Sequence, residues 1–219
     1  MLTQPMYRIS RVLLKLYARF MLEMDIRWQA ALPQGPVLFA ANHPSTTDPI
    51  YIHLVSPQPM SVMIAAKVFS IPMLGPYMRK LQQICVTPGH GGQALEQARQ
   101  TLEAGRSVTI FPEGLISPSP CEFHAPRSGV ARLALKSGVP VVPIGIYLNE
   151  ARCKRVPAEV NGEPDLITWY LRGPYAITVG EALHFYGDAE DQSLVKNIAE
   201  TVMQNIRTLA LVSQQRATS

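Results

Sequence analysis

The chain has 219 residues, of which 47% are hydrophobic and 16% are charged, and its formal net charge is +4. This length can bury a substantial core, and because no stretch has the composition of a linker, we expect one compact domain. The charged fraction lies below the ~25% that is usual for soluble domains. Five cations against two carboxylates fall within residues 1–27, so most of the positive excess lies at the N-terminus.

Several classes of protein are disfavoured at this stage. The cysteines Cys85, Cys121 and Cys153 lie far apart without metal-ligand spacing, which is typical of reduced cytosolic thiols. No apolar run reaches the ~18 residues of a membrane-spanning helix, and the N-terminus does not have the pattern of a signal peptide. The basic residues are not interleaved with aromatics, which argues against nucleic acid as a partner. We expect a cytoplasmic protein, or one bound peripherally to the cytoplasmic face of a membrane.

The N-terminal segment has helical periodicity from Tyr7 to Met24, because its apolar residues recur at intervals of three and four. A narrow basic stripe lies roughly opposite the apolar face, and it consists of Arg8, Arg11, Lys15 and Arg19. Such a helix can lie in a lipid headgroup layer. It can also pack on the core with a solvated basic face. We interpret residues 1–28 as an amphipathic, membrane-facing helix and residues 29–219 as the main domain.

The rest of the chain alternates apolar strands with helices. Strands are predicted at Val37–Ala41, Ser61–Ala65, Ile84–Thr87, Ser107–Phe111 and Val139–Tyr147, and helices at Ile50–Leu54, Gln93–Ala104, Gly129–Lys136 and about Ser193–Leu211. This alternation predicts a single α/β domain with a mainly parallel central sheet flanked by helices, and a ligand site at the carboxyl ends of the strands. Asn149–Asp165 is expected to be an exposed loop, followed by a strand pair formed by Leu166–Leu171 and Ala176–Val179.

The segment from Lys67 to Lys80 is apolar, rich in methionine and interrupted by prolines. Methionine adapts well to flexible apolar partners. The segment is therefore interpreted as a flap over an apolar ligand or a second membrane contact, with simple packing under a loop as the alternative.

Two loops carry the candidate chemistry. The first follows the strand Val37–Ala41 and contains His43 and, after four intervening residues, Asp48. This pair suits a general base and the carboxylate that orients it. Asp48 directly before Pro49 is also typical of a helix start, so a capping role is the alternative. The second loop, Phe111-Pro112-Glu113-Gly114, follows another predicted strand.

With these two loops the chain resembles the glycerolipid acyltransferases, the family of lysophosphatidic acid acyltransferase. The His-four residues-Asp block of that family matches His43 and Asp48, and its Phe-Pro-Glu-Gly block matches residues 111–114. Two further blocks match Lys67 with Ile71–Gly75, and the proline-bearing strand Val139–Ile144. The four blocks occur in family order between about Ala40 and Tyr147.

The resemblance implies transfer of a fatty acyl group from a thioester of coenzyme A or acyl carrier protein to a hydroxyl of a lysophospholipid or another lipid. The thioester is a co-substrate, and neither a cofactor nor a metal is implied. His43 would take the hydroxyl proton and Asp48 would fix the imidazole tautomer. Backbone amides or Lys67 would stabilise the oxyanion or bind the donor. Glu113 and Gly114, together with Arg127, would form the acceptor site.

Two positions depart from the family pattern. Where family members that act on glycerol-phosphate acceptors carry arginines, this chain has Pro88 and Ile116, neither of which can pair with phosphate. The acceptor phosphate is then bound by Arg79, Lys80 or Arg127, or the acceptor has no phosphate.

Two other functions are kept as alternatives. One is a non-catalytic lipid-binding protein of the same fold, and the other is a metal-dependent hydrolase that uses His43, Asp48 and Glu113 with His53 or His90.

Overall fold

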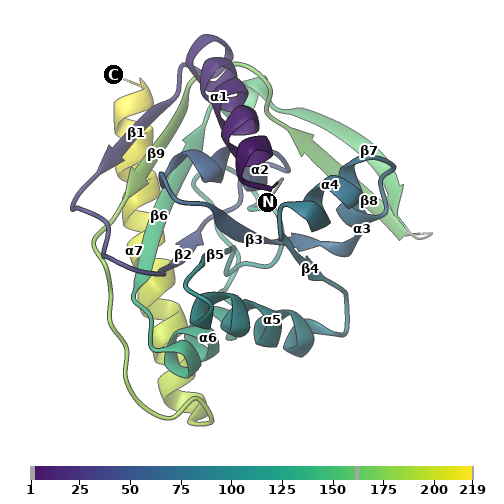
Figure 1. Cartoon of the computed structure of the whole chain (residues 1–219). Coiled ribbons are helices and arrows are strands. Elements are labelled where there is room, and N and C mark those ends of the chain that lie inside the picture. The colour runs from purple at the N-terminus through teal and green to yellow at the C-terminus, as the bar shows by residue number, and fades with distance from the viewer. Residues whose placement is uncertain (1–2, 161–162, 219) are drawn as a thin grey trace.

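The computed structural model describes residues 3–160 and 163–218. Its central strands are β1 (Asp25–Trp28), β2 (Leu38–Ala41), β3 (Met60–Ala65), β4 (Ile84–Val86), β5 (Ser107–Ile110), β6 (Val141–Leu148) and β9 (Tyr175–Val179). Within the described residues they form one seven-stranded sheet in the order β1-β9-β6-β2-β5-β3-β4 (Figure 1). Neighbouring strands are parallel except β6 and β9. The predicted α/β fold with a mainly parallel sheet is confirmed.

Helices cover both faces of the sheet, so its strands are buried on both sides. One face carries α5 (Gly91–Glu103), α6 (Gly129–Ser137) and α7 (Gln192–Thr218). The other carries α1 (Thr3–Met21), α2 (Asp48–Tyr51), the short 3-10 helix η1 (Ile52–Leu54) and α3 (Ala66–Phe69), with α4 (Leu74–Lys80) beside them. Side chains of β2 alternate between the two cores, because Leu38 and Ala40 face α5–α7 while Phe39 and Ala41 face the opposite layer.

The C-terminal helix α7 closes the core, as its periodicity predicts. It lies so close to β6 that a Cβ atom on Gly145 would come within 2.1 Å of the backbone at Leu209 and Ala210. Gly145 is therefore required by the close approach of the two elements. Ser213 of the same helix donates a hydrogen bond to the Gly145 carbonyl over 2.9 Å.

The N-terminal helix begins and ends earlier than the predicted Tyr7–Met24. It ends at Met21, the backbone turns at Glu23 with a φ of 45°, and Asp25–Trp28 pairs with β9 as an edge strand. The apolar pattern continues to Met24 because Leu22 and Met24 still contact the core after the helix has ended. No helix within the described residues is both long and apolar enough to cross a membrane. Met1 and Leu2, and Ser219 at the other end, lie outside the described residues.

The segment predicted to be an exposed loop is instead structured. After the 3-10 helix η2 (Glu150–Arg152), β7 (Lys154–Val160) pairs with β8 (Glu163–Trp169) as a separate antiparallel sheet. Asn161 and Gly162 lie outside the described residues. The predicted pairing of Leu166–Leu171 with Ala176–Val179 is also wrong, since β9 pairs with β1 and β6. The hairpin is largely exposed, so its strands have a polar sequence that resembles a loop.

Candidate active site

The two loops predicted to carry the chemistry meet at one edge of the sheet. The first follows β2 and the second follows β5, and these strands are parallel neighbours. Their carboxyl ends therefore lie side by side, where ligand sites form in parallel α/β sheets. The first loop is also anchored to β6, because the Asn42 amide donates to the Ile146 carbonyl over 2.8 Å and accepts from the Ile146 N–H over 2.7 Å.

His43 and Asp48 form the predicted pair. The imidazole Nδ1 lies 3.0 Å from Asp48 Oδ2, and the imidazole ring stacks on Phe111 with ring centroids 4.2 Å apart. The His43 side chain is 16% exposed while that of Asp48 is fully buried. With Nδ1 turned toward the carboxylate, the other ring nitrogen, Nε2, is the one that can receive a proton from a substrate.

The carboxylate of Asp48 is held by several donors. Ser45 donates its backbone N–H to Oδ2 and its hydroxyl to Oδ1, each over 2.7 Å. Tyr175 at the start of β9 donates its hydroxyl to Oδ1, also over 2.7 Å. Helix α2 begins at Asp48, but its N-cap residue is Thr47. The Asp48 side chain therefore supports the His43 loop and does not cap the helix.

Tyr175 is a polar group in the core. It is 1% exposed, and its ring meets that of Tyr51 edge-on with centroids 5.3 Å apart. Burial and the neighbouring Asp48 raise the pKa of Tyr175 well above its ordinary value, so the phenol keeps its proton and acts as a donor to Asp48.

Glu113 joins the second loop to the first. Its Oε1 accepts hydrogen bonds from the Ser117 hydroxyl over 2.6 Å and from the His43 N–H over 3.3 Å, and its Oε2 accepts from the His124 N–H over 2.8 Å. The Ser117 N–H in turn donates to the His43 carbonyl over 2.8 Å. Glu113 is 1% exposed. This burial differs from the acceptor contact implied by the resemblance, because both carboxylate oxygens are engaged within the protein.

Gly114 and Arg127 lie together at the surface of the second loop. Gly114 has a φ of 68°, and a Cβ atom there would come within 2.7 Å of the Arg127 side chain. Glycine is therefore favoured for two reasons: the positive φ angle strains other residues, and the Arg127 side chain occupies the space that a Cβ atom would need. Arg127 is exposed, so its guanidinium is accessible next to the loop. Pro88 lies in the exposed turn before α5, and the Ile116 carbonyl lies 3.2 Å from His124 Nε2.

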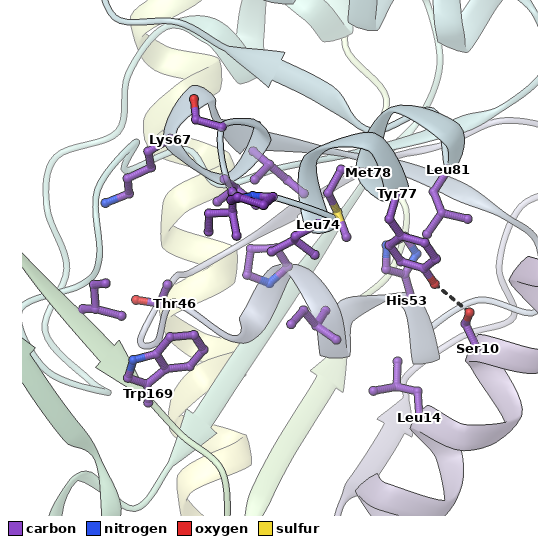
Figure 2. Close-up of a pocket in the computed structure, with 18 of the residues that line it drawn as sticks. Ser10, Leu14, Thr46, His53, Lys67, Leu74, Tyr77, Met78, Leu81 and Trp169 are labelled. Atoms are coloured by element: carbon purple, nitrogen blue, oxygen red, sulfur yellow. Dashed lines mark hydrogen bonds between the residues drawn. The ribbon is translucent and has the colours of Figure 1, made fainter. Parts of the chain in front are cut away.

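A cavity of about 950 Å³ lies beside the first loop, between α1, α2, the α3–α4 segment and the β7–β8 hairpin. Thr46 and Pro49 of the first loop line it, as does Lys67 of α3. Its middle is apolar, with side chains such as Leu74 and Met78 (Figure 2). The segment from Lys67 to Lys80, interpreted from sequence as a flap, forms two short helices that wall this cavity.

Known proteins resemble this chain in sequence and in fold. Residues 23–147 match the family model named Acyltransferase. The chain belongs to this acyltransferase family. A Pseudomonas aeruginosa lyso-ornithine lipid O-acyltransferase is 28% identical over 67% of this chain and 57% of its own length. A 1-acyl-sn-glycerol-3-phosphate acyltransferase of the same organism is 26% identical over 75% of this chain and 60% of its own length. The matches thus span less than two thirds of these two relatives.

A solved structure shows the same fold. The crystal structure of the 1-acyl-sn-glycerophosphate acyltransferase from Thermotoga maritima superposes with a TM-score of 0.60. The superposition covers 91% of this chain and 82% of that chain, at 21% sequence identity. The acyltransferase fold therefore extends beyond the family match, into the C-terminal part that contains β9 and α7.

The four cations of the basic stripe on α1 do not all face the same way. Arg8, Lys15 and Arg19 are exposed, whereas Arg11 faces the body of the protein and donates from Nη1 to the Pro57 carbonyl over 2.8 Å. Arg11 is partly buried and therefore differs from the three exposed cations with which the sequence grouped it. An apolar strip is exposed on the same helix, and it comprises Ile9, Val12, Leu13, Leu16 and Phe20.

Some supporting residues of the candidate site were not predicted from the sequence. Ser45 lies inside the His43 block, where a small hydroxyl residue near a carboxylate is a usable signal. Ser117 and Tyr175 carry no local signal, because each reaches the site through the fold. The metal-dependent hydrolase has no support in the arrangement of side chains, since no group of three or more His, Cys, Asp and Glu among the described residues can hold a metal ion.

Proposed function

We propose that this protein transfers a fatty acyl group from an acyl thioester to a hydroxyl of a lysolipid, with His43 as general base and Asp48 as its positioning carboxylate. The observation that carries the proposal is the 3.0 Å contact between His43 Nδ1 and the buried Asp48, on a loop whose Thr46 lines an apolar cavity. The donor is coenzyme A or acyl carrier protein thioester. No further cofactor is required.

In the proposed reaction His43 Nε2 removes the proton of the acceptor hydroxyl as its oxygen attacks the thioester carbonyl carbon. The carbon–sulfur bond then breaks, the ester forms, and the proton passes from the imidazolium to the leaving thiolate. Asp48 stabilises the imidazolium between these steps. Lys67 is a candidate for the oxyanion or for donor binding, because it lines the cavity with Thr46 of the catalytic loop.

The cavity supports binding of the acyl chain. Its volume of about 950 Å³ falls within the range of small-molecule sites, and its middle is apolar. Burial of a hydrocarbon chain there is favourable because apolar surface leaves water. The acceptor binds near Gly114 and the exposed Arg127. This chain has Pro88 and Ile116 where family members carry phosphate-binding arginines, and Arg127 supplies the missing positive charge.

The protein works as a peripheral protein on the cytoplasmic face of a membrane, because its substrates are lipids. The exposed apolar strip of α1, with Arg8, Lys15 and Arg19 beside it, suits insertion at an anionic lipid surface. The helix then brings the cavity, which is partly lined by α1, to the membrane.

The decisive experiment replaces the base. His43→Ala is expected to lower thiol release from acyl-CoA or acyl carrier protein thioesters by a factor of about 10² to 10⁴ across a panel of lysolipids, which is the usual contribution of general base catalysis. His90→Ala, at an exposed histidine, is the matched control and should keep full activity. Undiminished turnover in His43→Ala would remove the proposed mechanism. Chain binding without turnover in the unmutated protein would favour the lipid-binding alternative.

A further inference from the structure

The inner end of the cavity differs chemically from its walls. Among the described residues, three buried side-chain polar atoms have no hydrogen-bond partner, namely Tyr7 Oη, Arg11 Nε and His53 Nδ1. All three residues line this one cavity. Buried polar groups in proteins are normally hydrogen-bonded, and leaving them unpaired is costly. Three such groups on one cavity indicate a site for a polar group of a ligand.

These groups are neighbours in space. Tyr7 and Arg11 lie one turn apart on α1 and so share a face of the helix. The Tyr7 ring, which is 7% exposed, meets the His53 ring edge-on with centroids 6.0 Å apart. Beside them the Ser10 and Tyr77 hydroxyls lie within 2.6 Å of each other. In Figure 2, His53, Tyr77 and Ser10 lie at the opposite side of the cavity from Lys67 and Thr46.

Their protonation states define what the site can bind. Burial, together with the charges of Arg106 and Arg11, lowers the pKa of His53 to about 4, so the imidazole is neutral near pH 7. Burial raises the pKa of Tyr7, so its phenol is protonated. Arg11 Nε can only donate, whereas neutral imidazole and phenol groups can donate or accept. A hydroxyl complements this set, because it can accept from Arg11 and donate to His53 or Tyr7.

The apolar walls of the cavity disfavour the passage of a charged group to the polar end. Apolar side chains, including Leu74 and Met78, line the cavity between the catalytic loop and the polar end (Figure 2). A carboxylate would lose its hydration along these walls at a high cost, whereas a hydroxyl loses much less. The polar group therefore arrives on an apolar chain.

We propose that the inner end of the cavity binds a hydroxyl group carried by a fatty chain, with Tyr7, Arg11 and His53 as its hydrogen-bonding partners. The protein then prefers a hydroxylated chain to an unsubstituted chain of the same length. This assignment rests on the proposed function in one respect, namely that the cavity holds a lipid chain. The hydroxylated chain belongs to the acyl thioester or to the lysolipid acceptor.

A binding experiment tests the site without turnover. Palmitic acid and its monohydroxylated isomers are used to displace a fluorescent fatty acid from the full-length protein. We expect at least one isomer to bind about tenfold more tightly than palmitic acid, as one or two buried hydrogen bonds provide. Tyr7→Phe keeps the ring and removes the hydroxyl, so it should abolish most of this preference. His53→Phe, which keeps the ring contact with Tyr7, should also reduce it.

Tyr17→Phe is the matched control. Tyr17 also lines the cavity, but its hydroxyl already donates to the Leu171 carbonyl. This variant should keep the preference for the hydroxylated isomer. Equal affinity of the unmutated protein for palmitic acid and all its hydroxylated isomers, or an unchanged preference in both Tyr7→Phe and His53→Phe, would overturn the proposal.

Turnover assays identify the source of the hydroxyl. One arm supplies hydroxylated palmitoyl-CoA with an unsubstituted lysolipid, and the other supplies palmitoyl-CoA with a lysolipid whose chain is hydroxylated. A preference that Tyr7→Phe removes in the first arm assigns the site to the donor, and in the second arm to the acceptor. Selective binding without turnover in either arm would refute the acyltransferase activity while supporting the hydroxyl site.

Discussion

At the scale of single residues, the site depends on how the buried side chain of Asp48 is held in place. Asp48 is fully buried, yet its oxygens face His43, Ser45 and Tyr175. A buried charge is tolerated when donors surround it, and these donors also fix its direction. The orientation of the His43 ring is therefore set by residues that never touch substrate.

Tyr175 is the first of these residues to test. Tyr175→Phe removes one donor from Asp48 and leaves the packing of the ring, so kcat should fall by about tenfold, as expected for loss of one hydrogen bond to a charged group. KM for the lysolipid should stay the same, because Tyr175 is buried away from the acceptor site. Steady-state kinetics measure both. Tyr51→Phe, whose hydroxyl donates to the Tyr170 carbonyl, is a suitable control and should keep normal turnover. A rise in KM alone would contradict the positioning role.

Glu113 gives a second test at this scale. Glu113→Gln introduces an amide donor where three donors already converge, so at least one hydrogen bond is lost and the protein should be destabilised by about 1–3 kcal/mol. We expect kcat to fall because the His43 loop loses its anchor, with little change in KM for the acceptor. Urea unfolding and kinetics measure the two effects. Glu122→Gln, at an exposed residue of the same loop, controls for charge. A selective loss of acceptor affinity at normal stability would instead make Glu113 an acceptor ligand.

At the scale of elements, α1 has two functions on different faces. Its inner face lines the cavity with Tyr7, Arg11 and Leu14, while its outer face exposes apolar side chains such as Val12 and Phe20. An apolar surface of this kind on a helix indicates contact with another molecule or a membrane. In the proposed function the helix would therefore connect the chain-binding cavity with a membrane surface.

The exposed cations of α1 can be tested separately from its fold. The triple variant Arg8→Gln, Lys15→Gln and Arg19→Gln should weaken binding to phosphatidylserine-containing vesicles by about a hundredfold, since each cation near an anionic surface contributes about 1 kcal/mol. Arg11 is kept because it bonds the Pro57 carbonyl. Vesicle cosedimentation measures the effect, and raising the salt concentration should diminish it. Lys196→Gln on α7 is the control. If the triple variant binds the vesicles as tightly as the unmutated protein, the three cations contact only solvent and not the membrane.

At the scale of the whole molecule, the sequence predicts the central sheet better than it predicts the β7–β8 hairpin and the long-range contacts. The strands β2 to β6 are apolar runs because parallel strands are buried on both faces, and the sequence therefore predicts them, whereas the exposed edge strand β1 was not predicted. The β7–β8 hairpin was missed because its exposure removes that apolar signal. His43, Asp48 and Glu113 were found because their blocks are local in sequence. Tyr175 was missed because its contact with Asp48 spans 127 positions in the chain, and the true position of Arg11 required knowledge of which α1 face is buried.

The stability of the whole protein should depend on pH through His53. Its pKa is about 4 in the folded protein and near 6.5 in the unfolded chain, so the unfolded state binds more protons between these values. The free energy of unfolding should therefore fall as the pH drops from 6.5 to 4, by up to about 3 kcal/mol from this group. Urea titrations of the unmutated protein and His53→Phe at successive pH values measure this. The variant should show a flatter dependence, and identical slopes would refute the assignment.

The reversed direction of β9 has a further consequence. Because β9 runs antiparallel to β6, its first residue, Tyr175, lies opposite Leu148, the last residue of β6. A tyrosine that opens a strand thus arrives at the edge where the parallel strands end. The segment that identifies the family stops at residue 147. A growing or truncated chain that has completed this segment therefore carries His43 and Asp48 without the phenol that donates to Asp48, and the hydrogen bonds around Asp48 are complete only when β9 has formed.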